Sequence, residues 1–160
     1  LEGWLRGSVQ GVVNGVDGLT GRGMGFEGEE SFFRAISFVP LVGGLEANKT
    51  RYPYQIEWRL ETEGQTVRLR YGESLQAKGV WQWHTIREWP FAEASLRYWS
   101  DGEWLLHFPK QTLTYGGRDY PRLPQGILLN VESSKKSFSV FIALNSDTKK
   151  YTAPKINGVD

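Results

Sequence analysis

Aromatic and polar side chains alternate along residues 54–71 (YQIEWRLETEGQTVRLRY), a pattern that could build one wall of a ligand site. Successive side chains of an extended chain point to opposite faces, and the alternation resumes after a polar turn at residues 62–65. The segment therefore predicts a hairpin with one apolar and one charged face. The charged face, with cross-strand ion pairs, would carry Gln55, Glu57, Arg59, Glu61, Thr66, Arg68 and Arg70. The apolar face would carry Tyr54, Ile56, Trp58, Leu60, Val67, Leu69 and Tyr71.

Aromatic residues make up 14% of the chain, including 7 Trp. Small-molecule sites are usually lined by aromatic side chains with a few polar groups, and so many flat rings are awkward to pack without gaps. The alternative is that these rings pack on one another and fill the core. If there is a cavity, Arg87, Arg97 and Tyr98 could hold a ligand carboxylate, because Arg binds carboxylates through two parallel hydrogen bonds. The predicted ligand-binding residues are Tyr54, Trp58, Leu69, Tyr71, Trp81, Trp83, Arg97 and Trp99.

Residues that could support metal binding or catalysis are few. His84 and His107 are isolated, and single histidines without carboxylates at a suitable spacing do not form a metal site. No nucleophile elbow or H-E-x-x-H motif is present. We therefore predict no metal site and no catalytic residues, and an enzyme is the less favoured alternative. The acidic pairs nearest to a glycosidase arrangement are Glu57 with Glu61 and Glu73 with Glu88, although acids on polar strand faces are normally solvated.

Glycine is concentrated at the start of the chain. The glycine pattern of residues 21–25 (GRGMG) is similar to that of a phosphate-binding loop. Such a loop follows a buried strand and precedes a helix. The residues that follow, FEGEES, start no helix and carry acid where phosphate would sit. We expect residues 1–30 to form short, strongly bent strands and turns instead.

Length and charge exclude several classes of protein. A chain of 160 residues has the length of one domain, 1–160, and its net charge of +1 is too small for a nucleic-acid binder. No run approaches the roughly 18 apolar residues of a membrane span. The absence of Cys excludes disulfides and favours a soluble protein of the cytoplasm or the plastid. Since the sequence begins at Leu1, we expect either a removed leader or a longer precursor.

Strand patterns and turn residues recur along the chain. Asp101-Gly102 is a strong signal for a tight hairpin turn, and residues 88–96, around Pro90, are the best candidate for a short helix. The sequence therefore predicts an all-β fold with at most one short helix. It would be an antiparallel up-and-down barrel of about 8–10 strands, with a sandwich as the alternative. Residues 96–108 are expected to form a hairpin around Asp101-Gly102, and the other expected strands include residues 31–39, 54–61, 66–71, 79–89, 111–115, 126–132, 137–144 and 149–152.

The chain resembles the calycin superfamily, the lipocalins and fatty-acid-binding proteins. Gly3 and Trp4 lie near the place of the Gly-x-Trp motif in the first strand of those families, although here the two residues are adjacent. Residues 126–160 are similar in layout to the last strands of lipocalin-like domains of cyanobacteria and plastids, which are related to phycobiliprotein lyases. The resemblance implies a barrel that binds a bilin, a chlorophyll-type pigment or a lipid, and it transfers no site residues.

Three functions therefore stay open. The first is a non-enzymatic carrier for a small apolar or tetrapyrrole ligand. The second is a subunit of a larger, possibly photosynthetic, complex, with a filled core and a protein partner for residues 1–30 and 116–126. The third is a β-sandwich that binds or cleaves carbohydrate, which predicts Trp81, Trp83 or Trp99 in a surface groove.

Overall fold

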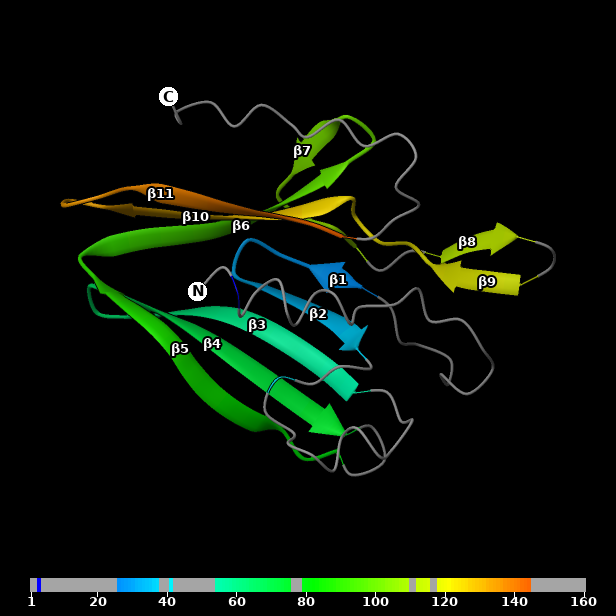
Figure 1. Ribbon diagram of the computed structural model, residues 1–160, viewed down its shortest axis with the longest axis horizontal. Coiled ribbons are helices and arrows are strands. Elements are labelled where there is room, and N and C mark those ends of the chain that lie inside the picture. The colour runs from blue at the N-terminus through cyan, green and yellow to red at the C-terminus, as the bar shows by residue number, and fades with distance from the viewer. Residues whose placement is uncertain are drawn as a thin grey trace.

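Figure 1 shows the computed structural model of the chain, which describes residues 3, 26–37, 41, 54–75, 79–109, 112–115 and 118–144. The regular elements within these ranges are the strands β1 to β11, and every pairing between them is antiparallel. The all-β class is thus confirmed. The strand expected at residues 149–152 and most of the Gly-rich residues 1–30 lie outside the described residues.

Sheet A is a meander in which neighbours in sequence are neighbours in space. The turn between β3 and β4 contains Gly64, which has a φ of 60°, a value that glycine adopts without strain. Leu60 pairs with Leu69, so the hairpin has the register expected from its alternation. The strands of sheet A are β1 (Glu27–Gly28), β2 (Phe32–Ser37), β3 (Tyr54–Glu63), β4 (Thr66–Leu75) and β5 (Gln82–Pro90).

Sheet B has the order β11-β10-β6-β7, so β6 lies between β10 and β7. The hairpin from β6 to β7 turns at Asp101 and Gly102, both with positive φ, as the sequence predicts. Two further strands form a separate hairpin from segments that the sequence assigned to a strand and a loop. The strands are β6 (Ala92–Ser100), β7 (Glu103–Leu105), β8 (Thr112–Tyr115), β9 (Arg118–Pro121), β10 (Gly126–Ser133) and β11 (Phe138–Ala143).

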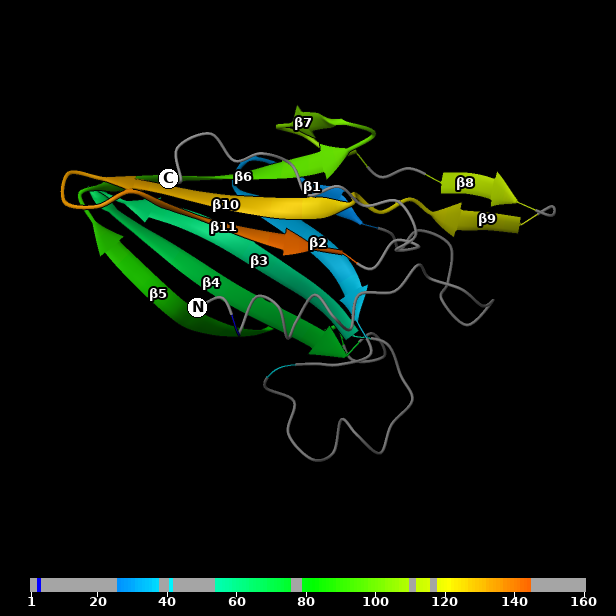
Figure 2. The same ribbon diagram turned by 45° about the horizontal axis from the view of Figure 1, so that its top comes forward.

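The two sheets lie one above the other and come closest where β5 passes into β6 (Figure 1). We call this the tip end, because the turns β3–β4, β5–β6 and β10–β11 gather there, and we call the opposite end the wide end. The turned view in Figure 2 shows the long strands β3, β4, β6, β10 and β11 all running between these two ends. These three turns thus bound the interior between the sheets at the tip end (Figure 1).

Backbone hydrogen bonds join the two sheets along one side. Gly28 of β1 exchanges two backbone hydrogen bonds with Phe108, with N···O distances of 2.8 and 2.9 Å. The Leu96 amide of β6 donates to the Glu30 carbonyl at 2.8 Å. On the other side, side chains make the contact, since the rings of Trp89 on β5 and Phe138 on β11 lie 5.8 Å apart. Closure into a complete barrel stays a prediction.

The inner faces of both sheets form the hydrophobic core. As the alternation predicts, the apolar side chains of the β3–β4 hairpin between Ile56 and Tyr71 point inward and are buried. Phe26, Phe33, Tyr98 and Phe108 pack in a cluster with ring centroids 5.6–6.3 Å apart. Such contacts are typical of stable aromatic pairs. The core residues of sheet B are Leu96, Tyr98, Ile127, Leu129, Val131 and Ile142.

The expected helical turn at residues 88–96 is wrong. Pro90 ends β5, and Phe91, with a φ of 51°, reverses the chain into β6. The Phe91 amide donates to the Gln65 carbonyl at 2.6 Å, which fixes this corner against the β3–β4 turn. Beyond it, Ala92, Ala94 and Leu96 face the core at strand spacing, so burial across the sheet outweighs the weak local helical pattern.

Replacing Gly28 by Ala tests the packing on the side where backbone hydrogen bonds join the two sheets. A Cβ atom at Gly28 would overlap the ring of Tyr98, whose hydroxyl is fixed by two hydrogen bonds. We expect Gly28→Ala to lower the free energy of unfolding by about 1–3 kcal/mol, the usual effect of overpacking. Urea denaturation measures this loss.

Gly72→Ala is the matched control. Its Cβ would lie 2.8 Å from the Trp83 ring, which is half-buried on the outer face of sheet A, whereas the Tyr98 ring is fully buried in the core. The control should lose clearly less stability, and equal losses at the two glycines would contradict the rigid packing of Tyr98.

Candidate functional site

Polar side chains gather on the inner face of sheet A towards the wide end. In an antiparallel sheet, residues directly opposite each other share a face. The register pairs Trp58 with Tyr71 and Tyr71 with His84, so these three side chains form one inward row. The next row pairs Ile56 with Glu73. The inner face thus places a carboxylate, a phenol and an imidazole beside large apolar side chains.

Tyr71 and Glu73 form a buried hydrogen-bonded pair. The Tyr71 hydroxyl donates to Glu73 Oε2 at 2.9 Å and accepts from the Leu41 amide at 3.4 Å. Burial raises the pKa of Tyr71, and the Glu73 carboxylate raises this pKa further. The phenol therefore keeps its proton at neutral pH and acts as a donor. Glu73 makes further interactions as well, so it is firmly placed.

His84 carries an unused hydrogen-bonding atom. Its Nε2 is buried and has no hydrogen-bond partner within the described part of the chain. Leaving a buried polar group without a partner costs about 1–3 kcal/mol, so each such group in a native structure needs an explanation. A ligand group that reaches this nitrogen would supply the missing hydrogen bond.

We call Tyr71, Glu73 and His84, together with the apolar side chains of Ile56 and Trp58, the inner site. Its chemistry suits binding more than catalysis, because it contains no nucleophile next to a base. Among the described residues, no group of three or more His, Cys, Asp or Glu is placed to hold a metal ion. The side chains of the inner site combine buried apolar surface with one imidazole nitrogen that has no hydrogen-bond partner among the described residues.

The structure brings together four of the eight predicted ligand-binding residues. Trp58, Leu69 and Tyr71 are fully buried on the inner face of sheet A, and Tyr54 is half-buried against the same core. The rings of Trp58 and Tyr71 lie 5.0 Å apart, so they also contact each other as the filled-core alternative predicts. The remaining four, Trp81, Trp83, Arg97 and Trp99, lie away from the inner site.

Trp81 and Trp83 belong to a stack of aromatic and cationic groups on the outer face of sheet A. Their rings lie 5.6 Å apart, and the guanidinium groups of Arg59 and Arg70 lie 5.5 and 5.3 Å from the Trp83 ring. These are cation–π distances. The stack therefore explains the position of Trp81 and Trp83 on the outer face of sheet A, and it requires no bound ligand.

Glu57 anchors the same stack although it lies on the charged face of the hairpin. Its side chain is only 1% exposed. Oε2 accepts from Arg34 Nε at 2.9 Å, and Oε1 accepts from Arg59 Nε at 2.7 Å. A buried carboxylate needs such partners, since an unpaired one would be very costly. Glu57 is therefore engaged and is not free to act as a catalytic acid beside Glu61.

Trp99 lies in a second aromatic cluster, on the outer face of sheet B. Its ring is 5.0 Å from that of Trp104, and Trp104 meets Phe141 edge-to-face at 5.9 Å. Arg97 lies on the same face and is exposed. Tyr98 points into the core, so the structure does not assemble the carboxylate clamp considered for Arg87, Arg97 and Tyr98.

The sequence analysis did not predict Glu73 and His84, two residues of the inner site, as ligand contacts. Glu73 is two residues beyond Tyr71 in the same strand, so continued alternation could have placed it on the inner face. His84 was assigned to the face opposite Trp81 and Trp83, and the register confirms this for Trp83, which lies over Gly72. His107, the other histidine, contacts the Glu29 carboxylate at 2.7 Å near the surface.

Comparison with models of known protein families gives no match to this chain, and no curated protein matches it either. Within the described residues, no helix has the length and the apolar character that spanning a membrane requires. The argument for a function therefore rests on the geometry of the sites.

The raised pKa of Tyr71 and of Tyr98, both caused first by burial, predicts the alkaline stability of the protein. A tyrosine in the unfolded chain ionises near pH 10, whereas these two keep their protons in the folded state. The free energy of unfolding should be unaffected by them below about pH 9 and fall above pH 10, because only the unfolded state then releases their protons.

Urea denaturation between pH 8 and pH 11 measures this fall. Tyr71→Phe should make the free energy of unfolding fall less steeply with pH, because unfolding then releases one proton fewer. A slope equal to that of the parent protein would mean that Tyr71 ionises in the folded state as well.

Proposed function

We propose that the protein is a non-enzymatic binding protein that holds a small, mostly apolar ligand between its two sheets, at the inner site. The observation that supports this most is the buried Nε2 of His84, which has no hydrogen-bond partner among the described residues, beside the Tyr71–Glu73 pair. A binding site with an apolar wall and a few fixed polar groups is the usual way in which proteins hold small molecules.

The surroundings of the inner site favour an apolar ligand body. Ile56, Trp58 and Leu69 are fully buried on the same face of sheet A. Their contact with a ligand would be worth about 25 cal/mol for each Å² of apolar surface removed from water. Aromatic rings also favour flat, conjugated molecules, since they stack on them. A bilin, a chlorophyll-type pigment or a lipid would each meet these conditions.

The polar groups favour a ligand with a hydrogen-bonding substituent. Tyr71 already donates to Glu73, whereas His84 Nε2 has no hydrogen-bond partner in the part of the chain that the structure describes. A hydroxyl, amide or carbonyl group near Nε2 would complete its hydrogen bonding at a net gain of about 1 kcal/mol or more. This requirement would select among apolar molecules, because a purely hydrocarbon ligand leaves the cost of the unpaired nitrogen in place.

For the fold, we further propose a barrel related to the calycins. The meander of sheet A and the backbone hydrogen bonds from Gly28 to Phe108 support it, because they enclose the interior on one side. Contact between Trp89 and Phe138 covers the other side without backbone hydrogen bonds. A ligand would then enter from the wide end, which is away from the converging turns.

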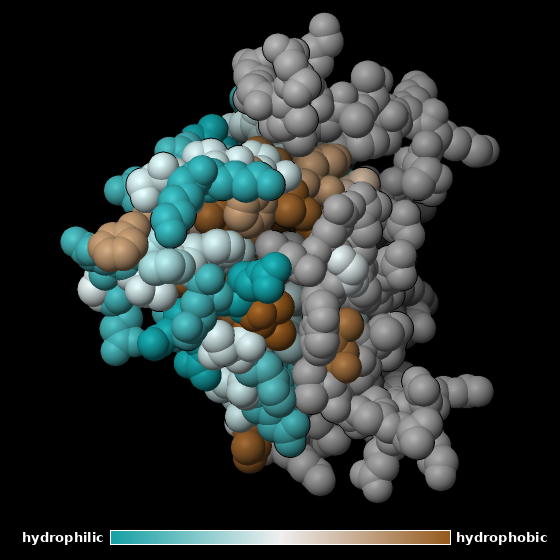
Figure 3. Space-filling view, turned by 60° about the vertical axis from the view of Figure 1, so that its left-hand side comes forward, coloured by the Kyte–Doolittle hydropathy of each residue, from teal (hydrophilic) through white to brown (hydrophobic). Residues whose placement is uncertain are grey.

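The alternative of a subunit in a larger assembly has little support from the described part of the surface, and most of residues 1–30, one of its two predicted partner segments, lies outside the described residues. Hydrophilic residues cover most of the described part of the tip-end face, and hydrophobic ones show only in small separate groups (Figure 3). The large exposed hydrophobic residues among those described are Val80, Phe91 and Leu106, on three different segments. Single exposed apolar residues are normal for a protein surface.

Gentle purification from the native source tests the proposed function directly. The absorption spectrum of the protein and the mass spectrum of its organic extract should show one bound compound at about one per chain. A ligand-free protein that co-purifies with large partners would instead favour the assembly subunit and overturn the proposal.

Substitution at the inner site then tests its location. We expect His84→Ala to lower ligand occupancy and to weaken binding about tenfold, the effect of losing one buried hydrogen bond of about 1.4 kcal/mol. Arg97→Ala is the control, because Arg97 is exposed on the outer face of sheet B. Unchanged binding in His84→Ala, with the fold intact by circular dichroism, would place the ligand elsewhere.

A further inference from the structure

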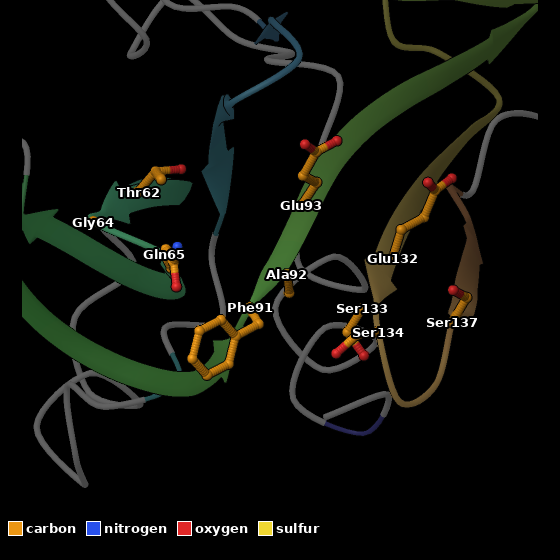
Figure 4. Close-up of a pocket in the computed structure, with 10 residues that line it drawn as sticks. All are labelled: Thr62, Gly64, Gln65, Phe91, Ala92, Glu93, Glu132, Ser133, Ser134 and Ser137. Carbon is orange, nitrogen blue, oxygen red and sulfur yellow. The ribbon is translucent and has the colours of Figure 1, made fainter.

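A hollow, which we call the tip pocket, lies at the tip end, where turns from both sheets meet. Its volume is about 620 Å³, within the size range of small-molecule sites. Figure 4 shows Gln65 and Phe91 on one side of it and the serines of the β10–β11 turn on the other. The residues that line it are Thr62, Gly64, Gln65, Phe91, Ala92, Glu93, Glu132, Ser133, Ser134 and Ser137.

One aromatic side chain, Phe91, is among the residues that line the tip pocket, and most of this side chain is exposed to water. Phe91 is 65% exposed, although Phe is among the residues most often buried. Its φ of 51° is unfavourable for a bulky residue, and the hydrogen bond from its amide to the Gln65 carbonyl holds it there. The corner would form more easily with glycine, so the core does not explain the presence of an aromatic ring at this position.

Most of the other lining side chains can both donate and accept hydrogen bonds. Gln65 has an amide that donates and accepts, and the hydroxyls of Thr62, Ser134 and Ser137 can do both. Ser133 is different, because its hydroxyl is already bonded to the backbone of Lys136. No Lys or Arg side chain is among the lining residues, so the tip pocket does not suit an anion.

Two carboxylates complete the lining. Glu93 on β6 and Glu132 on β10 are directly opposite each other in the register, and both are exposed. Like charges in this arrangement destabilise a sheet, and no ion pair with another described residue offsets them. Their chain neighbours Ala92, Ala94 and Val131 face the core, so both carboxylates lie on the outer face of sheet B and point away from the Phe91 ring (Figure 4). They add negative charge beside the tip pocket.

We propose that the tip pocket binds a neutral saccharide, independently of the ligand at the inner site. The Phe91 ring would stack on the C–H face of the sugar, while Gln65 and the hydroxyls of Thr62 and Ser134 hydrogen-bond its hydroxyl groups. An organic cation would also attract the carboxylates. It fits less well, because sites for such cations usually enclose the charge with several aromatic rings and only one ring lines this pocket.

Titration of the purified protein with glucose, galactose, mannose, N-acetylglucosamine and cellobiose tests the proposal. We expect at least one of them to bind with a dissociation constant on the order of 1 mM, measured by calorimetry and by saturation-transfer NMR. Phe91→Gly should weaken that binding at least tenfold without lowering the melting temperature, because it removes the ring and relieves the unfavourable φ. Gln65→Ala should weaken it while keeping the backbone carbonyl that holds the corner.

Val80→Ala is the matched control, since Val80 is an exposed apolar residue that does not line the tip pocket. It should bind the sugar like the parent protein. Three results would overturn the proposal: no binding of any of the five sugars at 20 mM (about twenty times the expected constant), binding that Phe91→Gly leaves unchanged, or preferential binding of tetramethylammonium as a test cation. None of these results bears on the inner site, whose occupancy is read separately from the organic extract.

Discussion

The hydroxyl of Tyr98 connects the two sheets, and much of the architecture depends on it. Tyr98 lies in β6 of sheet B, and its buried hydroxyl reaches the carbonyls of Glu29 and Phe32 in sheet A at 2.6 and 2.8 Å. Its ring needs the space that Gly28 leaves open. Because the edge strand β1 is tied to sheet B in this way, the sheets enclose an interior instead of splaying apart, and β1 is not exposed for pairing with other chains.

The high aromatic content has several separate structural uses. Trp58 fills the core, Trp83 stacks with two Arg side chains outside sheet A, and Trp99 and Trp104 pack together outside sheet B. Each environment suits an amphipathic ring for a different reason: apolar burial, cation–π attraction and edge-to-face contact. A count of Trp residues therefore overstates the lining of a single cavity, and only some of the aromatic side chains belong to the interior.

The two proposed sites lie at opposite ends of the same framework and differ in chemistry. The inner site is mostly apolar, and its buried His84 nitrogen has no partner among the described residues, whereas the tip pocket is polar, with an exposed ring on Phe91. The long strands β3 and β4 contribute to both, since β4 carries Tyr71 and Glu73 and the β3–β4 turn carries Gln65. This one hairpin therefore links the two sites.

The sequence by itself determined the local features of this protein. Alternation assigned the inner and outer faces of β3 and β4, and Asp101-Gly102 marked a turn correctly, because side-chain direction and turn conformation depend on residues close together in the chain. The inner placement of Tyr54, Trp58, Leu69 and Tyr71 followed from the same rule. The opposite placement of Trp83 and His84 did as well.

Only the tertiary structure decided features that depend on distant partners. The register of β4 with β5 shifts at Leu69, which leaves one extra residue in β5. Trp83 therefore faces outward while Trp89 faces the core, although simple alternation gives both residues the same face. The pairing of β6 with β10, the burial of Glu57 between two Arg side chains and the exposure of Phe91 are likewise invisible to local patterns. Each is set by contacts between segments that lie far apart in the chain, and the energy of those contacts overrides local preference.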